Sequence, residues 1–145
     1  MSQKLRELAS EPQTNGIGFF SLTKILFRDS GIPKPQIVDK RWGGELIYVN
    51  EDYCMKLLLI EAGKKTSMHF HVQKAETLMV IEGVLQIDYI TKEGENKTVH
   101  LSKYNAFTVN PGLPHQLIAL DKDVLLVEAS TYDQPEDSVR VKLWI

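Results

Sequence analysis

Residues 63–83, GKKTSMHFHVQKAETLMVIEG, hold the most informative pattern in the chain. On a β-strand, residues two apart point to the same side, so His69 and His71 would direct their imidazoles toward one point. Glu76 follows five residues after His71. A turn at 72–74 followed by a paired strand would bring its carboxylate beside the two imidazoles. This spacing predicts a metal site built on neighbouring strands.

A further candidate ligand, His115, opens the strand that follows the proline-rich turn at 110–114. Three neutral imidazoles and one carboxylate suit a divalent transition metal such as Mn, Fe, Zn, Ni or Co. Four protein ligands on an octahedral ion leave two open positions, where a substrate or water would bind. We therefore expect one divalent metal ion, held by His69, His71, Glu76 and His115.

Beyond Pro35 the chain consists of short runs rich in Val, Ile, Leu, Tyr and Thr, separated by turn residues about every ten positions. Such short runs leave no room for crossover helices, which predicts an all-β sandwich or barrel with antiparallel sheets. The link at 92–96 contains Gly94, a residue that tolerates the positive φ of a hairpin loop. The expected strands are 45–50, 53–61, 67–72, 77–82, 84–91, 97–102, 106–109, 115–120, 124–130 and 138–144.

The N-terminal segment is the only part of the chain with the spacing of a helix. Leu22, Ile25 and Leu26 share one helical face, although proline and glycine residues upstream would divide the segment into two short pieces. We expect residues 1–35 to form a helical extension and residues 36–145 to form the barrel.

The composition of the chain argues against several classes of partner and site. The 145 residues with 43% apolar content suit one domain, and a net charge of -2 argues against a nucleic-acid or membrane-surface partner. The longest apolar runs have four residues, and the first fifteen residues lack the apolar stretch of a secretory signal. The single cysteine, Cys54, excludes an internal disulfide and a CxxC site. We expect a cytoplasmic protein whose metal ligands are histidine and carboxylate.

The stretch 63–83 resembles the first motif of the cupin superfamily, G(x)5HxH(x)4E(x)6G. Every fixed position of that motif is matched, by Gly63, His69, His71, Glu76 and Gly83. The resemblance extends over about residues 36–144. It implies a cupin β-barrel of two sheets, similar to a jelly roll, in which the motif histidines, the glutamate and His115 bind the metal.

The second cupin motif, G(x)5PxGxxH(x)3N, is matched only in part. Gly112 and His115 hold their places, whereas Tyr104, Asn110 and Ala119 stand where the family has glycine, proline and asparagine. The missing residues normally shape turns or hydrogen-bond behind the ligands. Their absence therefore bears on turn geometry more than on metal binding.

A narrower resemblance points to sugars. The segments RWGGE at 41–45, YCMK at 53–56 and the closing stretch 130–141 are similar to sugar-isomerase cupins, namely the cupin domain of bifunctional mannose-6-phosphate isomerases and the D-lyxose isomerases. This resemblance implies that Lys56 and Arg140 contact a sugar hydroxyl, carboxylate or phosphate. The alternatives are a solvated lysine on an edge strand for Lys56 and a surface ion pair with a neighbouring carboxylate for Arg140.

Three functions fit this site. An aldose–ketose isomerase would use the metal to polarise a carbonyl and a base to move a proton between neighbouring carbons. The candidate bases are Lys56 and Glu82, the latter because it has the same strand parity as Glu76 and would face the same side. An Fe(II) or Ni(II) dioxygenase would need the same four ligands, and a non-catalytic cupin would only bind a small molecule. We expect the isomerase, acting on a sugar or a sugar phosphate as its small-molecule substrate, without nucleic-acid or membrane partners. The resemblance also implies a homodimer.

Overall fold

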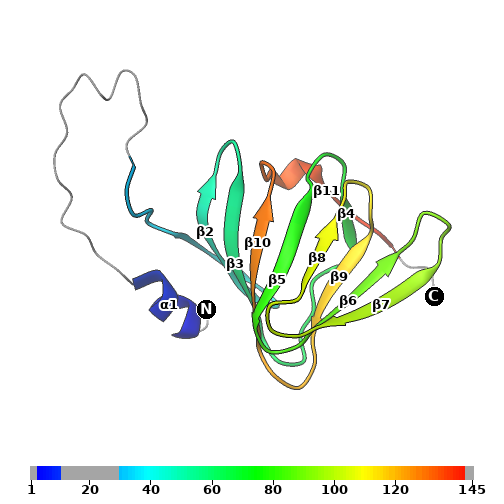
Figure 1. The fold of residues 1–145 in the computed structure, drawn as a ribbon, viewed down its shortest axis with the longest axis horizontal. Helices are drawn as coiled ribbons and strands as arrows, with labels where there is room; N and C mark the ends of the chain where they lie inside the picture. The colour runs from blue at the N-terminus through cyan, green and yellow to red at the C-terminus, as the bar shows by residue number, and fades with distance from the viewer. Residues whose placement is uncertain (1–2, 11–29, 143–145) are drawn as a thin grey trace.

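Two antiparallel sheets face each other across the barrel in the structure, a computed structural model that describes residues 3–10 and 30–142. Within these residues the larger sheet has six strands in the order β1-β2-β3-β10-β5-β8, and the smaller has five in the order β11-β4-β9-β6-β7. Figure 1 shows the larger sheet running from β2 to β8, with α1 beside its β2 side. The confirmed fold is therefore all-β, antiparallel and barrel-like.

The elements are α1 (Gln3–Ser10), β1 (Gln36–Lys40), β2 (Gly43–Asn50), β3 (Cys54–Ile60), β4 (His69–His71), β5 (Glu76–Glu82), β6 (Leu85–Ile90), β7 (Asn96–Leu101), β8 (Ala106–Val109), β9 (His115–Ala119), β10 (Val124–Ser130), the short 3-10 helix η1 (Pro135–Asp137) and β11 (Ser138–Arg140).

Each of the ten strands expected from the sequence is present, with ends shifted by a few residues; the last is shorter than expected and stops at Arg140. The strand β1 was not predicted, because its five residues are mostly exposed and show no apolar alternation. Gly94 adopts a φ of 83° in the hairpin loop between β6 and β7, as expected. Among the described residues, no helix has the length and apolar character to span a membrane.

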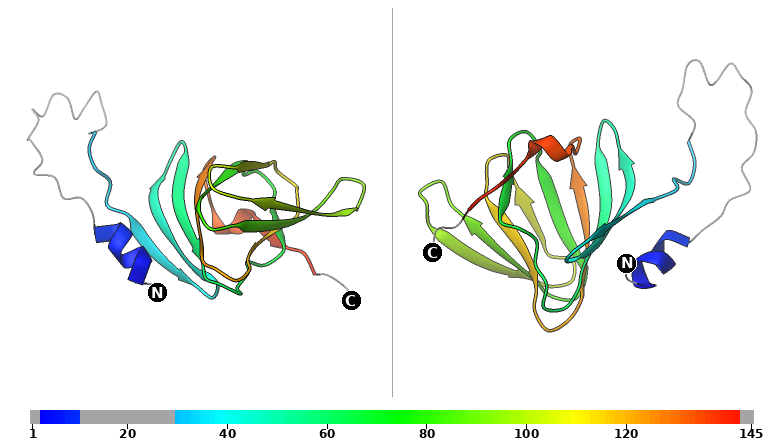
Figure 2. Two further views of the ribbon diagram at one scale, coloured as in Figure 1. Left: turned by 60° about the horizontal axis from the view of Figure 1, so that its bottom comes forward. Right: turned by 180° about the vertical axis from the view of Figure 1, so that it is seen from behind.

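The N-terminal helix α1 packs on the outer face of the larger sheet, as the two views in Figure 2 show. Its Leu5 is fully buried against Leu46, Leu59 and Leu125, which come from three neighbouring strands. Gly44 permits this close approach, because a Cβ at that position would lie 2.7 Å from Leu5 Cδ1. The expected helical face of Leu22, Ile25 and Leu26 lies outside the described residues.

The main core fills one end of the space between the sheets. Three neighbouring strands, β3, β5 and β10, each contribute two inward aliphatic side chains to it, and strands of the smaller sheet close it from the other side. These residues are Leu58, Ile60, Leu78, Val80, Val124 and Leu126 from the larger sheet, with Leu85, Ile87, Leu117 and Ala119 opposite. The other end of the same space is lined by charged side chains.

Tyr104 resolves the question raised by the partial second motif. It occupies the position where the family has glycine, and its φ of 68° lies in the left-handed region that favours glycine. The turn therefore keeps a glycine-like backbone although a tyrosine occupies it. Gly112, in the following turn, has a φ of 85° and donates its N–H to the carbonyl of His71 at 2.7 Å.

Candidate metal centre

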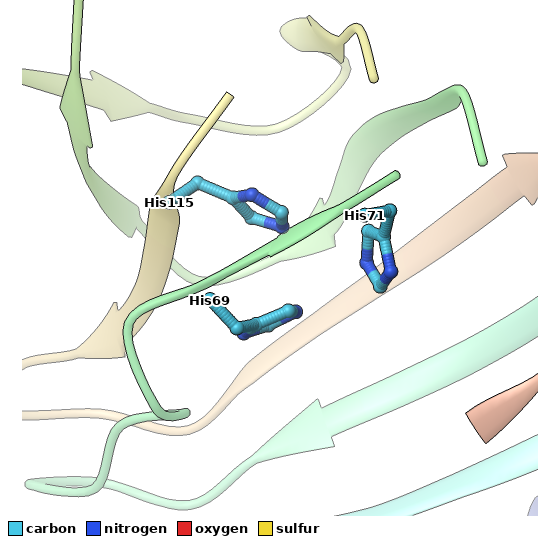
Figure 3. Close-up of side chains that lie close together, drawn as sticks. All are labelled: His69, His71 and His115. Atoms are coloured by element: carbon cyan, nitrogen blue, oxygen red, sulfur yellow. The ribbon is translucent and has the colours of Figure 1, made fainter. Parts of the chain in front are cut away.

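Three histidines of the smaller sheet converge on one point. His69 and His71 project from β4, and His115, the first residue of β9, pairs in register with His69. One ring nitrogen of each lies within 4.8 Å of the others, and Figure 3 shows the three imidazoles gathered around a common centre. The predicted convergence of these histidines is confirmed.

The hydrogen bonds behind the rings prepare two of them to act as ligands. The Nδ1 atoms of His69 and His115 lie 2.9 Å from the carbonyl oxygens of Ser67 and Leu113, to which each can donate its N–H. Metal-bound histidines characteristically bond through one nitrogen while the other donates to such a carbonyl. This tautomer leaves each Nε2 with a free lone pair.

Glu76 lies against this cluster. Its Oε1 is 2.9 Å from His115 Nε2 and 3.9 Å from His71 Nε2. When His115 donates through Nδ1, its Nε2 and the carboxylate oxygen are both acceptors, and a proton or a cation must lie between them. In addition, the buried Nδ1 of His71 has no hydrogen-bond partner among the described residues. The donor set therefore fits a metal ion, and Glu76 remains the predicted fourth ligand.

The histidines have the protonation state that metal binding requires. Burial and the neighbouring His115 lower the pKa of His69. Burial and the positive charge of Lys74 lower the pKa of His71 to about 4. Both imidazoles are therefore neutral at pH 7, and a neutral imidazole can donate its lone pair to a metal.

Beside the histidines, two buried lysines lie among four carboxylates. Lys74 Nζ is 2.9 Å from Glu76 Oε2, 3.3 Å from Glu128 Oε2 and 3.2 Å from Asp133 Oδ1. The second lysine, Lys56, pairs with Asp133 and lies 3.9 Å from Glu128 Oε2, with Glu45 Oε2 at 3.5 Å on its other side. We call these six side chains the lumen ion network: Glu45, Lys56, Lys74, Glu76, Glu128 and Asp133.

The lumen ion network is short of positive charge. With every member ionised, four carboxylates face two ammonium groups, which leaves a net charge of -2. Consistent with this shortage, burial and the charge of Glu76 raise the pKa of Glu128 to about 8. An unbalanced buried charge is costly, and a divalent cation at the adjacent histidines would balance it.

The histidines and the lumen ion network line one cavity of about 330 Å³. Its remaining walls include the side chains of Trp42, Leu58, Thr66 and Leu117. This volume lies at the lower end of the range for sites that bind small molecules. The cavity is therefore of a size that suits a compact small molecule.

Lys56 faces this cavity and is buried, which overturns the alternative of a solvated lysine on an edge strand. Its strand β3 lies between β2 and β10. Burial alone would lower the pKa of Lys56, but Glu128, Glu45 and Asp133 outweigh it and hold the pKa above its usual range. An ammonium group held by three carboxylates keeps its proton, so the structure argues against Lys56 as the base.

Glu82 lies outside the barrel lumen, contrary to the expectation from strand parity. It is exposed and forms an ion pair of 2.5 Å with Lys4 of α1. The reason is a bulge in β5: Val80 pairs with Leu126 and Glu82 with Leu125, which leaves Ile81 as an extra residue. The extra residue turns Glu82 to the outer face of the sheet. The structure therefore removes Glu82 from the candidate bases.

Arg140 is exposed on β11, opposite His69 in the strand register, and it lines the cavity. The alternative of a surface ion pair is not observed within the described part of the chain. Its expected partner Asp137 instead accepts the backbone N–H groups of Gln73 and Lys74 at 2.8 and 2.9 Å. These bonds fix the turn between His71 and Glu76.

Four members of the lumen ion network were not predicted from the sequence: Glu45, Lys74, Glu128 and Asp133. Lys74 lies in the turn before β5, and Asp133 lies in a loop that Asn50 holds through its side-chain amide. A usable signal existed for Glu128. It is the single charge in the apolar run of β10, and it pairs in register with Lys56, the single charge in the run of β3.

Comparisons with known proteins bear on the fold. No protein-family model matches the sequence, and no curated protein is similar enough in sequence to be matched. Several solved structures share the fold. The capsular polysaccharide assembling protein CapF from Staphylococcus aureus superposes with a TM-score of 0.67 at 15% identity, over 75% of this chain and 34% of that chain.

Oxalate decarboxylase from Bacillus subtilis superposes with a TM-score of 0.68 at 13% identity, over 90% of this chain and 40% of that one. KdgF from Halomonas sp. superposes with a TM-score of 0.58 at 19% identity, over 70% of this chain and 89% of that one. The chain thus spans about a third of the length of CapF. The chain shares the cupin-type barrel fold of these structures, and three histidines of its barrel form a cluster suited to a metal ion.

Proposed function

We propose that the protein is a metal-dependent isomerase that interconverts an aldose and a ketose. The observation that supports this most is the polar lining of the cavity next to the three histidines. Carboxylates, ammonium groups and the Thr66 and Ser67 side chains line the walls, and such groups hydrogen-bond to the hydroxyls of a sugar. An apolar substrate would leave these groups without partners, at a cost in binding free energy.

His69, His71 and His115 would hold the metal, with Glu76 as the fourth ligand. A bound divalent cation would act as a Lewis acid that polarises the substrate carbonyl and favours removal of a proton from the neighbouring carbon. The divalent ion would also balance the net charge of -2 that the lumen ion network has when all four carboxylates are ionised.

The proton would move through a carboxylate of the cavity wall. Glu128 and Asp133 are the two cavity carboxylates that contact both lysines, and neither belongs to the predicted ligand set. Lys56 and Lys74 orient them, because each ammonium bridges both. Trp42, Leu58 and Leu117 form the apolar part of the wall of the same cavity.

The experiment is an anaerobic screen of pentoses, hexoses and their phosphates with protein loaded with Mn(II), Co(II), Zn(II) or Ni(II), followed by proton NMR in D2O. We expect turnover and incorporation of solvent deuterium at the carbon next to the carbonyl. Glu128→Gln and Asp133→Asn separate the two candidate proton carriers: the change at the true carrier should lower turnover at least 100-fold. Glu95→Gln, in an exposed loop, is the matched control.

Metal binding is measured separately, by equilibrium dialysis followed by metal analysis. We expect about one ion per chain, and we expect His71→Ala to lower the affinity at least tenfold while the barrel stays folded. Failure of the wild-type protein to take up any of these ions would overturn the metal site. No exchange with any sugar, together with O2 consumption by Fe(II)-loaded protein, would transfer the function to a dioxygenase.

A further inference from the structure

The lysines inside the cavity are unavailable to an incoming anion. Lys74 contacts three carboxylates and Lys56 contacts three, and the network carries a net charge of -2 when every carboxylate is ionised. A divalent ion at the histidines would bring the combined net charge of the ion and the network to zero and leave no surplus positive charge. A substrate phosphate or carboxylate placed among these groups would therefore lose its hydration without gaining a free cation.

Two other cations line the same cavity and are in a different situation. Lys40 ends β1 and Arg140 ends β11, and both are exposed. Within residues 3–10 and 30–142, no carboxylate forms an ion pair with either. The strands β1 and β11 are the terminal strands of their sheets, one from each sheet. The cavity thus has unpaired positive charge where it meets solvent, contributed from both sheets.

We call the solvent-facing edge of the cavity, where Lys40 and Arg140 lie, the cavity rim. Arg140 places this rim close to the candidate metal ligands. Arg140 pairs with His69 across β11 and β4, so that their backbones are neighbours, about 5 Å apart. The planar guanidinium can bind a phosphate or carboxylate through two parallel hydrogen bonds, and Lys40 adds a point charge. Ser67, Gln134 and Ser138 also line the cavity and offer hydrogen bonds to hydroxyl groups of the same ligand.

We propose that the substrate carries an anionic group, a phosphate or a carboxylate, at the end remote from its carbonyl, and that Lys40 and Arg140 bind this group at the cavity rim. The neutral polyhydroxy end enters the lumen toward the histidines. This assignment rests on the proposed isomerase function for the direction of the substrate. The rim site itself does not depend on turnover.

Binding of unreactive ligands tests the proposal, because alditols and aldonates lack the carbonyl that an isomerase needs. Isothermal titration calorimetry of Zn(II)-loaded protein would use D-glucitol 6-phosphate, D-gluconate and neutral D-glucitol as probes. We expect at least one of the two anions to bind at least tenfold more tightly than D-glucitol. A preference for D-glucitol 6-phosphate that is lost in Lys40→Met/Arg140→Met assigns a phosphate to the rim, and a preference for D-gluconate lost in the same variant assigns a carboxylate. A preference that survives in that variant reflects direct binding to Zn(II) and would overturn the rim site.

A matched pair of double variants locates the site. Lys40→Met/Arg140→Met should lower the affinity for the preferred anion at least tenfold and leave that for D-glucitol unchanged. Arg41→Met/Lys142→Met removes the same total charge from neighbouring positions that do not line the cavity, and it should bind like the wild type. Equal losses in the two double variants would overturn the rim site, as would equal affinity for the anions and D-glucitol.

The outcomes of the two experiments are distinguishable. Anion binding that depends on Lys40 and Arg140, without turnover of any sugar, would retain the rim site and reject the isomerase. Turnover of a neutral sugar, with no contribution from these two residues, would retain the isomerase and reject the rim site.

Discussion

The two ends of the barrel lumen differ although the same three strands build both. Along β3, β5 and β10, the inward positions change from charged at one end to aliphatic at the other. The inward residues are Lys56, Leu58 and Ile60 on β3, Glu76, Leu78 and Val80 on β5, and Glu128, Leu126 and Val124 on β10. The backbone is shared, so the difference lies in the side chains alone.

The aliphatic end accounts for folding. Each fully buried aliphatic side chain contributes about 1.5–3 kcal/mol. The charged end makes no comparable contribution, since the cost of removing ions from water offsets much of their mutual attraction. Buried charges at such a cost are the reason that we place the proposed metal and substrate sites at this end of the barrel.

The largest effect is expected from Lys74→Met. This change leaves Glu76, Glu128 and Asp133 with one buried ammonium fewer, and removing one partner from a buried ion cluster costs about 3–5 kcal/mol of unfolding free energy. Urea unfolding of the variant and the wild type measures this loss of unfolding free energy. Lys97→Met, which breaks an exposed pair with Glu95, should stay within about 0.5 kcal/mol of the wild type.

A second variant keeps this prediction testable if Lys74→Met does not fold. Lys74→Met/Glu128→Gln removes one charge of each sign and should recover part of the loss. If the double variant were less stable than the sum of its single changes predicts, the ion network would not be the cause.

A smaller effect on the unfolding free energy is expected from a change of pH, because Glu128 titrates in the folded protein. Its pKa is raised to about 8 in the folded protein, so the folded state holds a proton that the unfolded state releases above pH 4.5. This contribution is fully present below pH 4.5 and is lost as pH rises through 8. The wild type should therefore lose stability relative to Glu128→Gln over that range, by a few kcal/mol.

Urea unfolding of both proteins without metal, at several pH values from 4.5 to 8.5, provides this comparison. Saturation with Zn(II) should reduce the pH dependence, because the added positive charge favours the ionised carboxylate. A constant difference between the two proteins would show that Glu128 is ionised throughout, and the proposed shortage of positive charge would be rejected.

The smallest effect is expected from Glu82→Gln, at the other end of β5 from Glu76. The pair between Glu82 and Lys4 is exposed, and such pairs contribute about 1 kcal/mol or less. Metal affinity, measured by dialysis, should match the wild type, in contrast to His71→Ala. A tenfold loss of metal affinity in Glu82→Gln would contradict the outward position that the β5 bulge gives this residue.

The sequence pattern was sufficient for ten of the eleven described strands and for the convergence of His69 and His71. Both depend on local regularities: alternation within short runs, and the i, i+2 spacing that directs His69 and His71 to one side. His115 joins the cluster because β9 pairs with β4, and the resemblance to cupins, not a local pattern, implied its place among the ligands. The strand pattern and the spacing of His69 and His71 need no knowledge of which strands are neighbours.

The rest of the site depends on pairing between distant strands. Glu128 meets Lys56 only because β10 lies beside β3, and Asp133 reaches both lysines from a loop held by Asn50. A one-residue bulge at Ile81 reversed the inferred direction of Glu82. Parity along a single strand cannot detect such a bulge, since the inserted residue is as apolar as its neighbours.

The helix α1 has a consequence for the colloidal behaviour of the protein. Leu5 covers Leu46, Leu59 and Leu125, three side chains on the outside of the barrel that are at most 6% exposed. Without the helix they would form a continuous apolar patch on adjacent strands, the kind of surface that makes proteins associate. A variant that lacks α1 should keep its metal site, whose residues lie on the opposite face of the sheet or beyond, yet precipitate at concentrations at which the full chain stays dispersed.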